Sequence, residues 1–140
     1  MRRTWVKKND VLLNITGASI GRTAIYAGND NKANVNQHVC IIRIEGESIL
    51  NPVYLNYYLS SQKVQNLILN QNLGATRQAL TFNQIGKIEI PLPPIELQNK
   101  FAAIVKEVEK LKEKQKQSKE EINLMFDSLM KQAFNGELVK

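Results

Sequence analysis

The longest regular pattern in the chain is a heptad of apolar residues in its C-terminal third. Apolar side chains recur there at intervals of three and four residues, which are the core positions of a coiled coil. These positions hold Leu97, Phe101, Ile104, Val108, Leu111, Ile122, Met125 and Leu129. No proline or glycine falls between Leu97 and about Phe134, and Asn135-Gly136 is a helix-stop signal. The pattern predicts one long helix.

Two polar residues interrupt the apolar seam of this helix, and a proline-rich segment precedes it. Gln115 and Ser118 occupy two core positions in the middle of the seam. The segment Pro91-Leu-Pro-Pro94 separates the helix from the preceding residues, and Pro94 can occupy the first helical turn. We therefore divide the chain into residues 1–93 and 94–140. A helix of about 38 residues spans roughly 57 Å, so most of the seam needs a partner helix. An ordinary amphipathic helix folded onto its own domain is the alternative, but it would show a wider apolar stripe.

Shorter apolar segments, separated by turn residues, fill the first ninety positions. Period-two patterns and turn residues predict strands at Val11–Thr16, Arg22–Tyr26, Val39–Ile44 and Lys87–Pro91. Helix-start signals and spacing predict helices from Asn51-Pro52 to Leu59 and around Val64–Ile68, and a short turn capped by Thr81 over Phe82–Gly86. The fold class is α+β: a small mixed domain with short strands and two or three short helices, followed by the long helix.

The net charge bears on the kind of partner that the chain can bind, and the cysteine content bears on its cellular compartment. The formal net charge is +6, and residues 1–96 carry 10 basic and 6 acidic side chains. This moderate excess suits a polyanion such as nucleic acid without requiring one. The single cysteine, Cys40, lies in an apolar run and is expected in a buried strand. A chain without an internal disulfide fits the cytoplasm, and no apolar run approaches membrane-spanning length.

Residues for catalysis or metal binding are few. One histidine, His38, and one distant cysteine make neither a metal site nor a nucleophile–base pair. The loop Gly17–Thr23 resembles a phosphate loop, but it is one residue short and has arginine where lysine is needed. We therefore expect no catalytic residue, no metal and no cofactor.

Two polar loops are better candidates for binding. One is Gly17–Arg22, and the other is Gly74–Gln78, which contains Thr76 and Arg77. Arginine can read guanine, and glutamine can read adenine, through paired hydrogen bonds. Such residues are also common on any protein surface, so the chemistry alone leaves DNA binding and an ordinary surface loop both open.

Six segments together resemble the target-recognition domain and spacer helix of type I restriction-modification specificity subunits. They occur in order over nearly the whole chain: Lys8-Asn-Asp-Val-Leu12, Thr16-Gly-Ala-Ser-Ile-Gly-Arg22, Asn36-Gln-His-Val39, Asn51-Pro-Val-Tyr-Leu-Asn-Tyr-Tyr-Leu59, Gly74-Ala-Thr-Arg-Gln78 and Ile88-Glu-Ile-Pro-Leu-Pro-Pro-Ile-Glu-Leu-Gln98. Each segment is a weak signal, whereas the ordered set is fairly specific.

The resemblance implies recognition of double-stranded DNA without catalysis, in a complex with methyltransferase and restriction endonuclease subunits. A full subunit of this family has two recognition domains, and two long antiparallel helices set their spacing. The implied DNA-contacting residues are Arg22, Thr76, Arg77 and Gln78, with Asn36, Gln37 and His38 behind them. The long helix would pair with its own copy, as a homodimer, or with another specificity subunit.

Family recognition domains usually begin well before the segment that matches Lys8–Leu12. We therefore expect a half-subunit that is truncated at its N-terminus. The alternative function is an interaction protein that pairs through its helix with specificity or methyltransferase subunits and does not read DNA.

Overall fold

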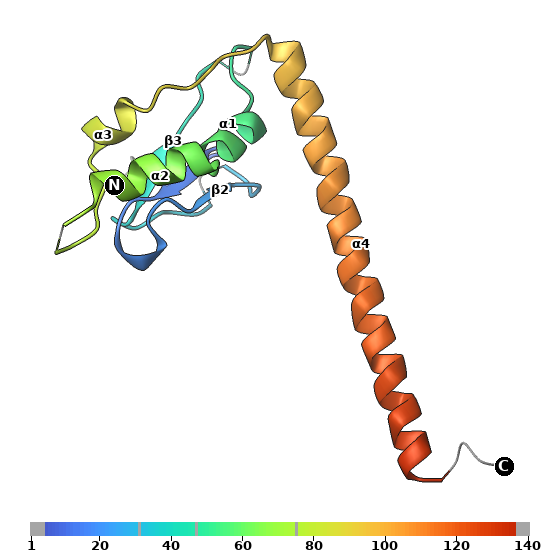
Figure 1. Cartoon of the computed structure of the whole chain (residues 1–140). Coiled ribbons are helices and arrows are strands. Elements are labelled where there is room, and N and C mark those ends of the chain that lie inside the picture. Colours follow the sequence, from blue (N-terminus) through green and yellow to red (C-terminus); the bar gives the residue numbers. More distant parts are fainter. Residues whose placement is uncertain (1–4, 31, 47, 75, 137–140) are drawn as a thin grey trace. The chain divides into compact units, whose positions relative to one another are not determined.

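The computed structural model describes residues 5–30, 32–46, 48–74 and 76–136 (Figure 1). The backbone forms two compact units, which meet between Ala102 and Ala103. The first unit contains a three-stranded sheet and short helices, and the second contains most of one long helix. This arrangement confirms the α+β class. Our division at residues 93 and 94 follows the proline-rich segment instead, and it stays a prediction.

The sheet is antiparallel and small. Its strands are β1 (Val11–Asn14), β2 (Thr23–Ile25) and β3 (Val39–Ile42), in the order β2-β1-β3. Val11 of the central strand lies opposite Ile25 on one side and Ile42 on the other. The first three strands predicted from the sequence are therefore present, each with shorter ends. Between β1 and β2 the chain forms one 3-10 turn, η2 (Gly17–Ser19).

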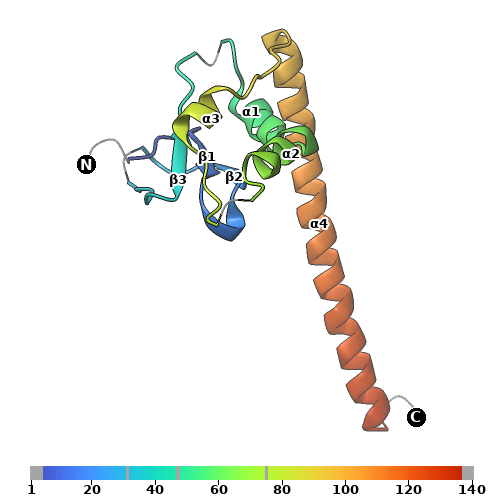
Figure 2. The same ribbon diagram turned by 60° about the vertical axis from the view of Figure 1, so that its left-hand side comes forward.

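Three short helices follow the sheet, and local capping explains where two of them begin. They are α1 (Pro52–Leu59), α2 (Gln62–Gln71) and α3 (Phe82–Gly86). The Asn51 side chain accepts hydrogen bonds from the first-turn amides of α1, and Thr81 forms a capping box with Gln84 at the start of α3. Both predicted caps are confirmed. Figures 1 and 2 show α1 and α2 on one side of the sheet.

The core lies between the sheet and these helices. Its buried members are Val11, Leu13, Cys40, Leu55, Leu59, Val64, Ile68 and Leu80. Burial raises the pKa of the Cys40 thiol, because a thiolate would lose its hydration there. Cys40 is thus a buried strand residue, as predicted.

The predicted strand at Lys87–Pro91 is wrong. Among the described residues this segment has no strand partner, and its carbonyl groups instead accept hydrogen bonds from tyrosine side chains of α1. Tyr58 donates to the Glu89 carbonyl at 2.9 Å, and Tyr54 donates to the Pro91 carbonyl at 2.8 Å. The apolar residues of the segment do pack against the core. The alternation therefore predicted burial correctly, but burial does not require a sheet.

The long helix, α4, extends from Ile95 to Phe134 over 40 residues. It begins one residue after Pro94, whose carbonyl accepts hydrogen bonds from the amides of Leu97 and Gln98. Pro94 therefore precedes the first turn, where we had expected it to be included. At the other end Gly136 adopts a φ of 72°, and its N–H donates to the Ala133 carbonyl. The predicted helix stop is confirmed.

Gln98 fixes the first turns of α4 to the rest of the first unit. Its side chain is buried, and its amide nitrogen donates to the carbonyls of Ile49 and Pro93 at 3.0 and 2.8 Å. Its amide oxygen accepts from the Asn51 N–H at 2.8 Å. One side chain thus joins the start of α4 to the start of α1.

Candidate nucleic-acid interface

Three segments that are distant in sequence meet where β1 ends. The Ile15 N–H donates to the His38 carbonyl at 2.9 Å, and the Leu80 N–H donates to the Ile15 carbonyl at 2.8 Å. The Gly17 N–H donates to the Gln78 carbonyl at 3.1 Å. Residues 15–17 therefore lie between His38 on one side and residues 78–80 on the other, held by backbone hydrogen bonds that need no particular side chain.

These segments surround an open hollow of about 830 Å³. It is lined by Thr16, Gly17, Ala18, His38, Thr76, Arg77, Gln78 and Ala79. Four of the seven predicted DNA-contacting residues are among them, and these come from two separate loops. The side chains of Thr76, Arg77 and Gln78 are exposed, so their hydrogen-bonding groups are accessible from solvent.

The tripeptide Asn36-Gln37-His38 is organised around the histidine. The His38 Nδ1 atom lies 2.6 Å from the Thr16 hydroxyl, and its Nε2 atom lies 3.3 Å from the Gln37 amide nitrogen. A neutral imidazole with its proton on Nδ1 satisfies both contacts. The Asn36 side chain accepts from the His38 N–H at 3.0 Å. Asn36 and Gln37 therefore hold His38 in place and do not line the hollow.

A buried asparagine that we did not predict supports the second loop. Asn72 donates from its amide nitrogen to the Ile68 carbonyl at 2.8 Å, and its oxygen accepts from the Ala79 N–H at 2.9 Å. It thereby ties the end of α2 to the end of the loop. Gly74 in the same loop has a φ of 81°, a conformation that glycine adopts without strain. Asn72 directly follows α2 in the structure, whereas the helix predicted around Val64–Ile68 ends four residues earlier.

Arg22 lies apart from this hollow. It is exposed and precedes β2, and it does not line the same surface as Arg77. Its backbone N–H donates to the Ser19 carbonyl, and its carbonyl accepts from the Asn14 N–H. The structure thus places the predicted DNA-contacting residues in two places, with Arg77 in the hollow and Arg22 outside it.

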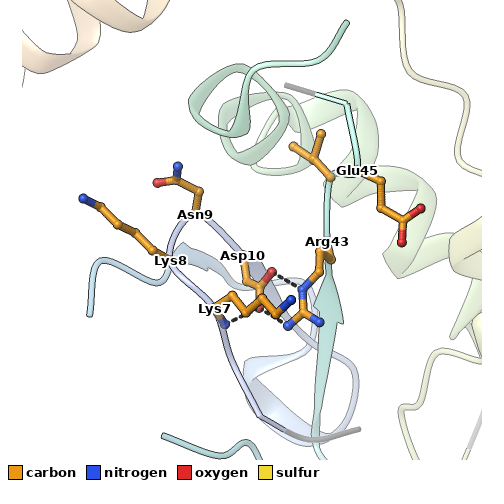
Figure 3. A pocket seen from close by; sticks show the side chains of 7 residues that line it. Lys7, Lys8, Asn9, Asp10, Arg43 and Glu45 are labelled. Atoms are coloured by element: carbon orange, nitrogen blue, oxygen red, sulfur yellow. Dashed lines mark hydrogen bonds and ion pairs between the residues drawn. The ribbon is translucent and has the colours of Figure 1, made fainter. Parts of the chain in front are cut away.

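A second hollow, of about 390 Å³, is lined by Lys7, Lys8, Asn9, Asp10, Arg43, Ile44 and Glu45. The Arg43 guanidinium faces the buried Asp10 carboxylate (Figure 3), with contacts of 2.9 and 2.7 Å from Nε and Nη2. Arg43 also donates to the Trp5 carbonyl, and the Lys7 N–H donates to Asp10. Because Asp10 and Arg43 already neutralise each other, this hollow is better explained as an ion pair that stabilises the fold than as an anion-binding site.

Burial acts to raise the pKa of Asp10, but the Arg43 hydrogen bonds, the Lys7 N–H and the nearby positive charges outweigh it. The net result is a pKa below the usual value. No local pattern indicates that Asp10 is buried, because its partner Arg43 lies 33 residues away in the chain.

In the part of the chain that the structure describes, no cluster of three or more histidine, cysteine or acidic side chains could hold a metal ion. Over the same residues, no helix is both long and apolar enough to cross a membrane.

Comparison with known proteins adds an independent line of evidence. The family described as "Type I restriction modification DNA specificity domain" matches residues 3–124. The chain is also 30% identical, over 142 aligned positions, to the type I restriction enzyme EcoBI specificity subunit of Escherichia coli. That alignment covers 98% of this chain and 29% of the relative, so the chain spans less than a third of the length of that protein.

Proposed function

Because this chain belongs to the type I restriction modification DNA specificity family, we propose that it contacts its DNA target through the hollow between residues 15–18, His38 and residues 76–79. Specificity subunits are not catalytic, and family membership therefore confirms our prediction that the chain is not an enzyme. The observation that carries the proposal is the convergence of His38, Thr76, Arg77 and Gln78 on one accessible surface.

The chemistry of this surface suits base recognition. The Arg77 guanidinium can donate two hydrogen bonds to guanine, and the Gln78 amide can pair with adenine in the major groove. The Thr76 hydroxyl can contact a base edge or a phosphate. His38 is held by Thr16 and Gln37, so it would present a fixed polar edge and not a mobile side chain. In this proposal Asn36 and Gln37 act through His38.

Arg22 would have a different role. Since it lies outside the hollow, we assign it to the DNA backbone, where a cation contributes affinity but no sequence information. Changing Arg22 would then weaken binding to all duplexes by a similar factor and reduce the dependence of affinity on salt. Changing Arg77 or Gln78 would instead weaken the preference for one base pair.

The long helix supports the second part of the proposal, which concerns association. The seam residues of α4 are exposed, from 37% for Phe101 to 63% for Ile104. We propose that α4 pairs antiparallel with a second copy or with another specificity subunit, and that methyltransferase and endonuclease subunits join this assembly. A cytoplasmic location stays a prediction.

A salt titration of DNA binding tests the recognition proposal. Target duplexes would be selected from a random pool with the chain and its methyltransferase subunits. We expect Arg77→Ala and Gln78→Ala to lower the affinity for the selected duplex by about 10- to 100-fold, the cost of one lost paired contact. Lys63→Ala, which removes an exposed cation of α2 outside the hollow, is the matched control.

The competing function, an interaction protein that does not read DNA, is favoured by the extent of exposed apolar surface on α4. The same titration separates the two. If the chain and the methyltransferase subunits together bind no duplex even at low salt, the recognition proposal is wrong and the interaction function remains.

A further inference from the structure

Residues 78–80, which end the second loop of the hollow, are held along both of their edges. On one edge, two backbone hydrogen bonds of 3.1 and 2.8 Å join them to residues 15–17. On the other edge, the Ala79 N–H donates to the side-chain oxygen of Asn72 at 2.9 Å. Successive residues of an extended segment direct their N–H groups to opposite sides, so Asn72 takes the edge that residues 15–17 leave open.

Asn72 is itself fixed by α2 and not by the loop. Its side chain is 7% exposed, and its amide nitrogen donates to the Ile68 carbonyl at 2.8 Å. Its backbone N–H donates to the Leu69 carbonyl at 3.0 Å. Because the buried residues of α2 belong to the core, Asn72 connects Ala79 to a part of the fold that does not move with the loop.

The residues between these anchors have no such support. Gly74, Thr76 and Arg77 form no hydrogen bond with another residue that the structure describes. Gly74 also has a φ of 81°, which few other residues adopt without strain. The direction of the Arg77 side chain therefore depends on where the ends of the loop are held. The bond from Asn72 acts one residue beyond Gln78 and two beyond Arg77.

We infer that Asn72 is a positioning residue for base recognition, which sets where Arg77 and Gln78 meet the DNA. It thereby determines how strongly the chain prefers its target. Asn72 is buried and does not line the hollow, so it acts through the loop and does not touch the DNA. The inference rests on the proposed recognition of DNA by this hollow and adds a residue that controls specificity.

The physical reason lies in what a paired contact requires. Specificity is the difference between the affinities for two duplexes. A paired hydrogen bond to one base needs a fixed donor geometry, whereas a long cationic side chain that has moved can still contact the phosphates of any duplex. Releasing residues 78–80 should therefore weaken binding to the target and hardly change binding to other duplexes.

A purely stabilising role for Asn72 predicts a different result. Loss of stability lowers the fraction of folded chains, and this lowers the apparent affinity for every duplex by the same factor. The ratio of the affinities for two duplexes then stays the same. This ratio therefore separates a positioning role from a structural one.

Three variants make the comparison. Asn72→Leu has a similar volume and removes both side-chain hydrogen bonds. Asn72→Asp keeps an acceptor for the Ala79 N–H and loses only the donor to the Ile68 carbonyl. Asp10→Asn is the matched control, because it removes the charge of a buried polar side chain whose printed partners lie outside the loop. Asn72→Ala replaces the first variant if the leucine prevents folding.

The affinities are measured with duplexes selected by the chain and its methyltransferase subunits, and with copies changed at one base pair. The changed positions are those at which Arg77→Ala or Gln78→Ala removes the preference. The unmodified chain should prefer the selected duplex by about 10- to 100-fold over each copy. Asn72→Leu should lower this ratio by at least about fivefold, whereas Asn72→Asp and Asp10→Asn should keep it within about twofold.

Amide hydrogen exchange tests the underlying bond without DNA. In Asn72→Leu, the Ala79 N–H should exchange at least about tenfold faster than in the unmodified chain, because it has lost its acceptor. In Asn72→Asp it should stay protected. An unchanged exchange rate in Asn72→Leu would mean that Asn72 does not hold residues 78–80, and the inference would be overturned.

The two proposals fail in different ways. If the unmodified chain binds every duplex equally or binds none, the recognition proposal is wrong and this inference falls with it. If the unmodified chain discriminates and Asn72→Leu keeps the same ratio, this inference alone is wrong. A ratio that falls equally in Asp10→Asn would also overturn it, since any loss of stability would then have the same effect.

Discussion

At the scale of single residues, the first unit depends on buried polar side chains whose partners are far away in sequence. Asp10 is 2% exposed and pairs with Arg43, and Gln98 is 1% exposed and joins three backbone groups. Both are fully partnered, which is the condition under which a buried polar group does not destabilise a protein. Neither role could be predicted, because a polar residue in a sequence is expected at the surface until its partner is known.

The Asp10–Arg43 pair makes stability depend on pH. The folded state lowers the pKa of Asp10, so the stabilisation is complete above the unfolded-state pKa of about 3.9 and is lost as the pH falls through the lower folded-state value. We expect Asp10→Asn to lower the free energy of unfolding by about 1–3 kcal/mol at pH 7. Denaturant unfolding of both chains between pH 7 and pH 2.5 is the measurement.

The difference between the two chains should shrink below pH 4, because the protonated carboxyl of Asp10 then resembles the amide of the variant. Glu120→Gln is the control, since Glu120 is an exposed carboxylate of α4 that lies outside the first unit. A difference that stays constant down to pH 2.5 would mean that the charge of Asp10 does not contribute to stability.

At the scale of secondary structure elements, the sequence predicted best where the signal is local. Asn51 and Thr81 act as helix caps through hydrogen bonds to residues two or three positions away, so the few neighbouring residues contain all the information. The prediction of a strand at Lys87–Pro91 was wrong, because pairing into a sheet depends on a partner strand. Its alternating pattern indicated only which side chains pack against the core. The hydroxyls of Tyr54 and Tyr58 donate to its backbone carbonyls, which a partner strand would otherwise bond.

The candidate interface was predicted in part: its residues were identified from the sequence, but their arrangement in space was not. The two loops that contain His38 and Arg77 were identified from their residue types. Their meeting at Thr16–Ala18 was not, because it arises from backbone hydrogen bonds between segments up to 65 residues apart, as between Ile15 and Leu80. Arg22 was also chosen from its residue type and its loop, but it does not line the hollow. Residue type alone therefore does not predict which side chains share a surface.

The junction between α1 and α4 offers a prediction at this scale. Gln98→Ala removes three partly buried hydrogen bonds and takes away the side-chain partner of the Asn51 N–H and of the carbonyls of Ile49 and Pro93. We expect the free energy of unfolding of the first unit to fall by about 2–4 kcal/mol. Thermal unfolding followed by tyrosine fluorescence is suitable, since Tyr54 and Tyr57 contact Phe101 in the next turn of α4.

Gln117→Ala is the control for this change, because it removes the same side chain from an exposed position of the same helix. Equal unfolding temperatures for the Gln98 and Gln117 variants would contradict the proposed anchoring role. The C-terminal part of α4 should keep its helical circular dichroism in the Gln98 variant when it is paired, because its stability would come from the partner helix.

At the scale of the whole molecule, the proposals combine into one expectation about DNA. A chain with one recognition surface and one pairing helix would read a single half of a target, and a twofold pair would read two halves in opposite orientation. The helix pairing then matters only for targets that contain both halves. Binding of the two halves would be linked, since the second contact forms within a complex that is already assembled.

Met125→Asp separates these contributions. It places a carboxylate in the exposed apolar seam of α4 through which the helix is proposed to pair, and an unpaired buried charge is strongly unfavourable. We expect the variant to be monomeric and to lose at least about 100-fold in affinity for a duplex with both half-sites, while its affinity for a single half-site stays within about twofold. Lys116→Asp, which makes a larger charge change on the outer face of α4, should leave both affinities close to those of the unmodified chain. Titration of the three chains against both duplexes measures this directly. Equal losses on the two duplexes would mean that α4 acts on the recognition surface itself, and the assignment of α4 as a spacing element would then be wrong.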